Sequence, residues 1–175
     1  MKIHHPHLIV LACLSISALA CSQAQAADTV SAKDQAFVMK AAQGGMTEVQ
    51  LGQMAADKAT SQDVKDFGSK MVTDHGKAND ELKSIAGTKG ITLSDKLDAK
   101  HQAMVDKMTA TSAAAFDKAY VSAMVKAHEK DDALFSKEAA SGDDADIKAF
   151  AAKTDDVVKM HLKMIQDIQS KMATK

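Results

Sequence analysis

Apolar residues recur at spacings of three and four from about Ser31 to Met172, and this spacing limits the fold more than any other feature. It is typical of amphipathic α-helices, which bury an apolar stripe against a shared core. A strand would need alternation with a period of two, and no convincing run of that kind occurs. The single proline stands at position 6, so nothing interrupts the helical pattern. The sequence therefore predicts an all-α fold.

Four long helices and one short helix follow from these stripes and from the residues at their ends. The predicted ranges are 31–58, 62–86, 94–108, 113–140 and 144–172. Ser94 is expected to cap the short helix, and Gly87 to end the second long one. Two tight hairpins joined by a long crossover are the ferritin-like variant of the four-helix bundle.

A shift of 83 residues aligns the first predicted hairpin with the second without a gap. It places Phe37 on Tyr120 and Glu48 on Asp131. Identity along the rest of the alignment is sparse, and helices rich in Ala and Lys align easily. The shift suggests an internal duplication of the hairpin.

The first residues have the pattern of an export signal. An apolar run, Leu8–Ala20, follows Lys2 and is too short to be a transmembrane helix. The small residues of Ala24-Gln25-Ala26 predict cleavage after Ala26. Residues 1–26 are thus expected to be a signal peptide and residues 27–175 one helical domain, which implies a periplasmic location.

A second processing route competes with this cleavage. Ala18-Leu19-Ala20-Cys21 fits a permissive lipobox, in which Cys21 is acylated and becomes the mature N-terminus. The usual Leu three residues before the cysteine is Ala here. Lipidation would anchor the protein to the outer membrane. No later stretch is apolar enough to span a bilayer.

Composition excludes several classes of function. Both cysteines, Cys13 and Cys21, lie in the leader, so the mature domain has no thiolate for catalysis or zinc binding. All 22 basic residues are Lys, and Arg is the favoured reader of phosphates and bases. There is no Trp and one Tyr, which leaves no stacking platform. A nucleic-acid partner is therefore not expected.

Each long helix places one polar, metal-competent residue in its apolar stripe. These residues are Glu48, His75, His128 and His161, and Asp74, Glu129 and Asp131 stand beside them. At about 1.5 Å per residue, the four lie within a turn or so of one level in the bundle. Glu, Asp and neutral His are ligands of zinc, iron and manganese. The pattern predicts a divalent-metal site.

The sequence indicates possible metal ligands more clearly than it indicates a reaction. A di-iron site needs Glu-x-x-His twice, but Val72, Val125 and Val158 stand three residues before the histidines. This absence argues against an oxidase or ferroxidase and disfavours an enzyme. Copper is an alternative, because methionines flank the histidines; they are Met71, Met124, Met160 and Met164.

The same residues have a metal-free interpretation. A buried Glu–His cluster can be a plain polar network that fixes the register of the helices. The chain would then be a structural or stress-related envelope protein. The residues alone leave both hypotheses open.

Three segments stand out along the chain: Met71-Val72-x-Asp74-His75, which is the most distinctive, Gly45-x-x-Glu48-Val49-x-Leu51-Gly52 and Phe116-Asp117-x-x-Tyr120. They resemble the domain of unknown function 4142 family, whose members are exported or lipoprotein-type bacterial proteins classed as ferritin-like. The resemblance implies the fold, an envelope location, and the polar positions Glu48, Asp74, His75, His128 and His161. It implies no activity. The family often has a proline before the histidine of the last helix, and this chain has none there.

Overall fold

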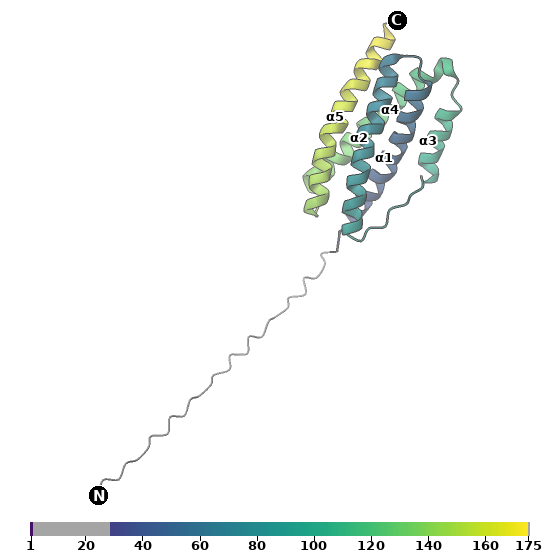
Figure 1. Ribbon diagram of the computed structural model, residues 1–175. Coiled ribbons are helices and arrows are strands. Elements are labelled where there is room, and N and C mark those ends of the chain that lie inside the picture. Colours follow the sequence, from purple (N-terminus) through teal and green to yellow (C-terminus); the bar gives the residue numbers. More distant parts are fainter. Residues whose placement is uncertain (2–28, 175) are drawn as a thin grey trace.

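The computed structural model describes Met1 and residues 29–174, and all of its secondary structure is helical there. The predicted cleavage site after Ala26 and the predicted lipidation site at Cys21 lie outside the described residues. The helices are α1 (Ala32–Lys58), α2 (Gln62–Thr88), α3 (Ala99–Thr109), α4 (Ala113–Ser141) and α5 (Ala145–Ala173) (Figure 1). The all-α prediction is confirmed.

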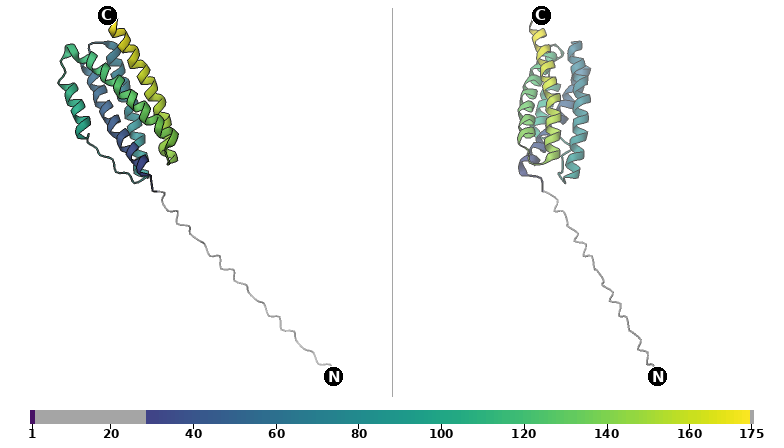
Figure 2. Two further views of the ribbon diagram at one scale, coloured as in Figure 1. Left: turned by 180° about the vertical axis from the view of Figure 1, so that it is seen from behind. Right: turned by 90° about the vertical axis from the view of Figure 1, so that its left-hand side faces the viewer.

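The helices form a bundle of two antiparallel hairpins. α1 packs along α2 and α4 packs along α5, while α2 also contacts α5 and α1 contacts α4. A long crossover that contains α3 returns the chain from the end of α2 to the start of α4, and α3 lies against α1 and α4 (Figures 1 and 2). This is the predicted ferritin-like four-helix bundle with a short extra helix in its crossover.

Two buried carboxylates tie the hairpins together by equivalent contacts. Asp34 at the start of α1 accepts hydrogen bonds from the backbone N–H groups of residues 143 and 144, at 3.1 and 2.6 Å. Asp117 at the start of α4 accepts from those of residues 60 and 61, at 3.1 and 2.8 Å. Each carboxylate thus holds the turn of the opposite hairpin. The shift of 83 residues that relates Asp34 to Asp117 also relates the two turns, which supports the predicted duplication.

Three local predictions need correction. The Ser94 hydroxyl bonds to the backbone of Lys96 in a tight turn, so α3 begins later, where the Asp98 carboxylate accepts from the His101 N–H. α2 continues past Gly87 to Thr88 and ends in a Schellman motif, in which Gly90 takes a φ of 70°. The spacing of three and four in the last predicted helix also places Val157 in the apolar stripe, but in α5 Val158 is buried instead, because the core-facing stripe passes three residues before His161.

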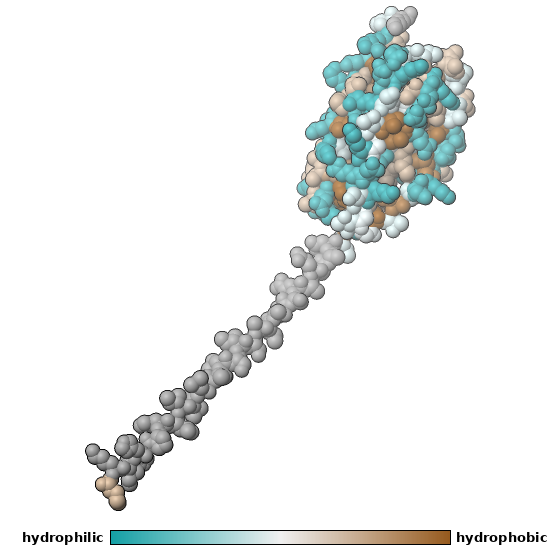
Figure 3. All heavy atoms as spheres, viewed as in Figure 1, coloured by the Kyte–Doolittle hydropathy of each residue, from teal (hydrophilic) through white to brown (hydrophobic). Residues whose placement is uncertain are grey.

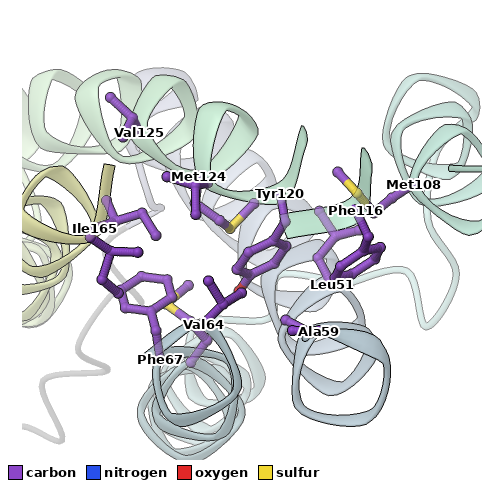
Figure 4. Close-up of a cluster of buried hydrophobic side chains, with 14 of the residues drawn as sticks. Leu51, Ala59, Val64, Phe67, Met108, Phe116, Tyr120, Met124, Val125 and Ile165 are labelled. Atoms are coloured by element: carbon purple, nitrogen blue, oxygen red, sulfur yellow. The ribbon is translucent and has the colours of Figure 1, made fainter. Parts of the chain in front are cut away.

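The core consists of two apolar clusters with a polar layer between them. One contains Leu51, Phe67, Tyr120 and Ile165, whose side chains point into the space between the helices (Figure 4). The other contains Phe37, Leu82, Phe135, Phe150 and Val158. The buried polar residues of the stripes lie between the two clusters along each helix.

The outer surface is mainly hydrophilic on the face shown in Figure 3, with scattered apolar residues. Among the helices of residues 29–174, none has the length and hydropathy needed to cross a membrane.

The closest approach between α1 and α2 depends on two glycines. A Cβ added to Gly68 would lie 2.6 Å from the backbone oxygen of Gly52 and 2.8 Å from the Cβ of Ala55. A Cβ added to Gly52 would lie 2.8 Å from the backbone oxygen of Gly68. Because backbone atoms cannot yield as a flexible side chain can, the helices must move apart to accept either substitution.

We expect Gly68→Ala to lower the free energy of unfolding by about 1–3 kcal/mol, the usual cost of overpacking. Urea denaturation measures this. Gly76→Ala on the same helix is the matched control, because a Cβ there meets nothing within 4 Å. The control should gain about 0.5–1 kcal/mol from the better helix propensity of Ala. Equal behaviour of the two variants would contradict the close-packing argument.

Candidate metal centre

Three histidines from three different helices converge in the polar layer. His75 lies on α2, His128 on α4 and His161 on α5. Their ring centroids are 5.2 to 5.9 Å apart. Each offers a ring nitrogen such that all three atoms lie within 4.8 Å of one another. His128 and His161 are fully buried and His75 is 5% exposed.

One nitrogen of each ring is already engaged by an oxygen atom. The Nδ1 of His75 lies 3.1 Å from the Oε2 of Glu48. The Nδ1 of His128 lies 2.9 Å from the backbone oxygen of Met124, one turn earlier in α4. The Nε2 of His161 lies 2.9 Å from the Oδ2 of Asp74. The Met124 carbonyl and the ionised Asp74 carboxylate can only accept, so the engaged nitrogens of His128 and His161 carry the ring protons, and we assign the same tautomer to His75, whose Nδ1 faces Glu48.

The second nitrogen of each ring has no partner among the described residues. These atoms are the Nε2 of His75, the Nε2 of His128 and the Nδ1 of His161, and all three are buried. With the proton on the opposite nitrogen, each of these atoms presents a lone pair. The centre therefore gathers three buried lone pairs that no hydrogen-bond donor satisfies, and such groups need an explanation.

Burial keeps the three imidazoles neutral. It lowers the pKa of His75 to about 3, assisted by the neighbouring His161 and His128. It lowers the pKa of His128 to about 4, although the hydrogen bond to Met124 opposes the shift. Burial also lowers the pKa of His161 against the opposing effect of Asp74. Neutral imidazole is the form that coordinates metals.

Asp74 connects the centre to the surface. Besides His161, its Oδ2 contacts the Nζ of Lys70 at 2.9 Å. Burial alone would raise the pKa of Asp74, but the hydrogen bonds from Lys70 and His161 outweigh it and lower the pKa. The carboxylate is therefore ionised at neutral pH and orients the His161 ring. Sequence reasoning missed Lys70, although its spacing of four residues from Asp74 is that of a helical ion pair.

Glu48 and Asp131 form a carboxyl pair beside the histidines. Burial, the nearby charge of Asp131 and a hydrogen bond between the two carboxyls raise the pKa of Glu48 well above its usual range. Burial raises the pKa of Asp131 to about 6. The raised pKa of Glu48 favours its protonated form, and its Oε2 lies 3.1 Å from the Nδ1 of His75. Burial and the proximity of Glu48 also raise the pKa of the Tyr120 hydroxyl.

The structure brings together six of the seven predicted metal-site residues. Glu48, Asp74 and Asp131 stand around the three histidines, but Glu129 is exposed and forms no hydrogen bond or ion pair within residues 29–174. Glu129, predicted as an outer-shell or alternative ligand, points away from the histidine cluster, because consecutive helical residues point about 100° apart. The methionines of the copper hypothesis lie in different environments. Met71 and Met124 pack in the first apolar cluster, whereas Met160 is 41% exposed.

The neutral histidines predict a specific loss of stability in acid. The unfolded chain takes up protons from about pH 6.5 downward, whereas folded His75 and His128 do so only near pH 3 to 4. The contribution of these two histidines to the stability of the metal-free protein is therefore full above pH 6.5 and falls as the pH drops through this window, whereas the raised pKa values of Glu48 and Asp131 act in the opposite direction in every variant compared. Each histidine contributes up to about 1.4 kcal/mol per pH unit.

Urea midpoints of metal-free protein between pH 7 and pH 4.5 measure this slope. His128→Leu should flatten it, and His101→Leu on the surface of α3 is the control that should retain it. The assignment fails if His128→Leu and the unmodified protein show the same pH dependence.

Comparison with known proteins bears on the fold and on the family. The bundle resembles the crystal structure of a DUF305 fragment from Deinococcus radiodurans, with a TM-score of 0.71 and 9% sequence identity, over 81% of this chain and 98% of that one. At this identity the likeness concerns the fold alone. No curated protein matches the chain. The family described as domain of unknown function (DUF4142) matches residues 19–168, so the chain belongs to the DUF4142 family.

Proposed function

We propose that this protein binds a divalent transition metal ion through His75, His128 and His161. The observation that carries the proposal is the set of three buried, unpartnered ring nitrogens within 4.8 Å of one another. Leaving a buried polar atom unsatisfied costs about 1–3 kcal/mol. A bound cation would satisfy all three atoms at once.

The surroundings of the rings match the outer shell of a metal site. Metal-bound histidines almost always give their other ring N–H to a carboxylate, a backbone carbonyl or a water. Glu48, the Met124 carbonyl and Asp74 take this part. Glu48 faces the protonated nitrogen of His75, so we assign it to orienting that ring rather than to the metal. This replaces the four-ligand set suggested by the sequence pattern.

Zinc fits the donor set best. Three imidazoles with a fourth position open to water are one established zinc arrangement. Zn–N bonds of about 2.0–2.1 Å set tetrahedral nitrogens about 3.4 Å apart, so the nitrogens, now within 4.8 Å, close by at most about 1.4 Å on binding. Imidazole also suits iron and copper, whereas manganese prefers oxygen ligands. No reaction is assigned to the site.

Zinc titration of chelator-treated protein, prepared without a His-tag, tests this proposal. We expect one zinc per chain, a rise in melting temperature on binding, and a loss of at least 100-fold in affinity for His128→Ala. Asp74→Asn should lose about 10- to 100-fold, as outer-shell partners usually do. His101→Ala is the matched control, because His101 pairs with Asp98 on the surface and lies outside the histidine cluster.

Two results would support the metal-free alternative, in which the polar layer only fixes helix register. One is substoichiometric metal in the unmodified protein after repletion with zinc, iron and copper. The other is a melting temperature that these cations leave unchanged.

We also infer that the protein acts in the bacterial envelope, on the strength of the apolar run Leu8–Ala20 and the cleavage pattern after it. Cleavage after Ala26 would release it to the periplasm, and acylation of Cys21 would anchor it to the outer membrane.

Intact mass of the protein recovered from a bacterial envelope fraction distinguishes the two routes. We expect a chain that begins at Ala27, because the residue three before Cys21 departs from the lipobox. A diacyl or triacyl mass on Cys21 would establish the lipid anchor instead. An unprocessed chain that starts at Met1 would contradict both routes.

A further inference from the structure

A cavity of about 620 Å³ lies between α1, α3 and α4, away from the three histidines. It exists because the crossover lays α3 against both α1 and α4. Its volume falls within the roughly 300–1,000 Å³ of small-molecule sites. The lining includes Glu48 and Asp131, so the inner end of the cavity reaches the carboxyl pair.

The floor of the cavity is apolar. It is formed by Leu51, Met108, Ala123, Met124, Ala127 and Leu134. The small alanines on α4 leave the space, and the flexible methionines can adapt to a chain laid against them. No Phe, Tyr or Trp side chain of the described residues lines the cavity. A flexible aliphatic group therefore suits the floor better than a flat ring that requires stacking.

Lysines surround the rim of the cavity, and within residues 29–174 they form no ion pairs with acidic side chains. Five lysines line it, at positions 40, 100, 107, 126 and 130, and none forms an ion pair within the described part of the chain. His101, also on the rim, is paired with Asp98. Among the described residues, the only acidic groups in the lining are Glu48 and Asp131, and burial raises the pKa of both.

We propose that this cavity binds a single-chain amphipathic carboxylate, such as a fatty acid. The aliphatic chain lies along the floor, and the carboxylate pairs with the free lysines of the rim. Burying the chain stabilises the complex in proportion to the number of CH₂ groups removed from water, and unpaired lysines give the charge complementarity that selects an anion. The site uses none of the three histidines, so it stands or falls independently of the metal.

Calorimetric titration with dodecanoate, below its micelle concentration and on chelator-treated protein, tests the proposal. We expect one dodecanoate per chain, with dodecanol and dodecyltrimethylammonium at least ten times weaker. Equal binding of dodecanol would overturn the role of the lysines. Binding to phosphatidylglycerol vesicles without binding of free dodecanoate would overturn the single-chain ligand.

Two pairs of variants on α4 locate the site. Lys126→Glu with Lys130→Glu should weaken dodecanoate at least tenfold, whereas Lys118→Glu with Lys137→Glu changes the same charge outside the cavity and should not. Ala123→Phe should fill the floor and abolish binding, whereas Ala133→Phe, exposed on the same helix, should not. Circular dichroism confirms that each variant is folded. Equal losses within either pair would refute the assigned site.

Discussion

The need to satisfy a layer of buried polar groups governs the middle of this bundle. Each long helix brings one such group to the same level, between two apolar clusters. Glu48, Asp74 and a backbone carbonyl each contact one ring nitrogen and orient the three imidazoles, and burial of the Glu48–Asp131 pair raises the pKa of both carboxyls. The network satisfies one side of every ring and leaves the other side free. An apolar layer would pack more simply but would coordinate nothing.

Most of the fold could be predicted from the sequence because helical periodicity and cap residues are local properties. The four long helices follow the expected ranges closely, and Ser31 and Asp144 cap α1 and α5 through their side chains. The errors lie where tertiary contacts decide. Gln43 on α1 bonds the backbone of Lys96 and Asp98 in the crossover, and the helix that follows begins at Ala99 rather than Ser94.

The candidate site could be predicted in membership but not in orientation. Spacing identifies His75, His128 and His161 because an imidazole in an apolar stripe must face the core. It does not show which nitrogen points inward, since that depends on the rotation of each helix and on partners from other helices. A glutamate that binds a metal and a glutamate that orients a histidine would show the same sequence pattern. The contact between Glu48 and the Nδ1 of His75 favours the second role. Glu129 is likewise exposed because it directly follows the buried His128 in the same helix and therefore points in another direction.

The shift of 83 residues that relates the two capped turns has a further consequence at the centre of the bundle. It carries Glu48 onto Asp131, so the carboxyl pair joins equivalent positions of the two hairpins. It carries His75 onto Val158, however, and relates His128 and His161 to Gly45 and Ala78. A small cavity of about 10 Å³, lined in part by Gly45 and Ala78, lies there. The two hairpins are therefore alike in backbone but unlike in the side chains that they bring to the centre, since the three histidine positions of one arrangement are occupied by Gly45, Ala78 and Val158 in the other.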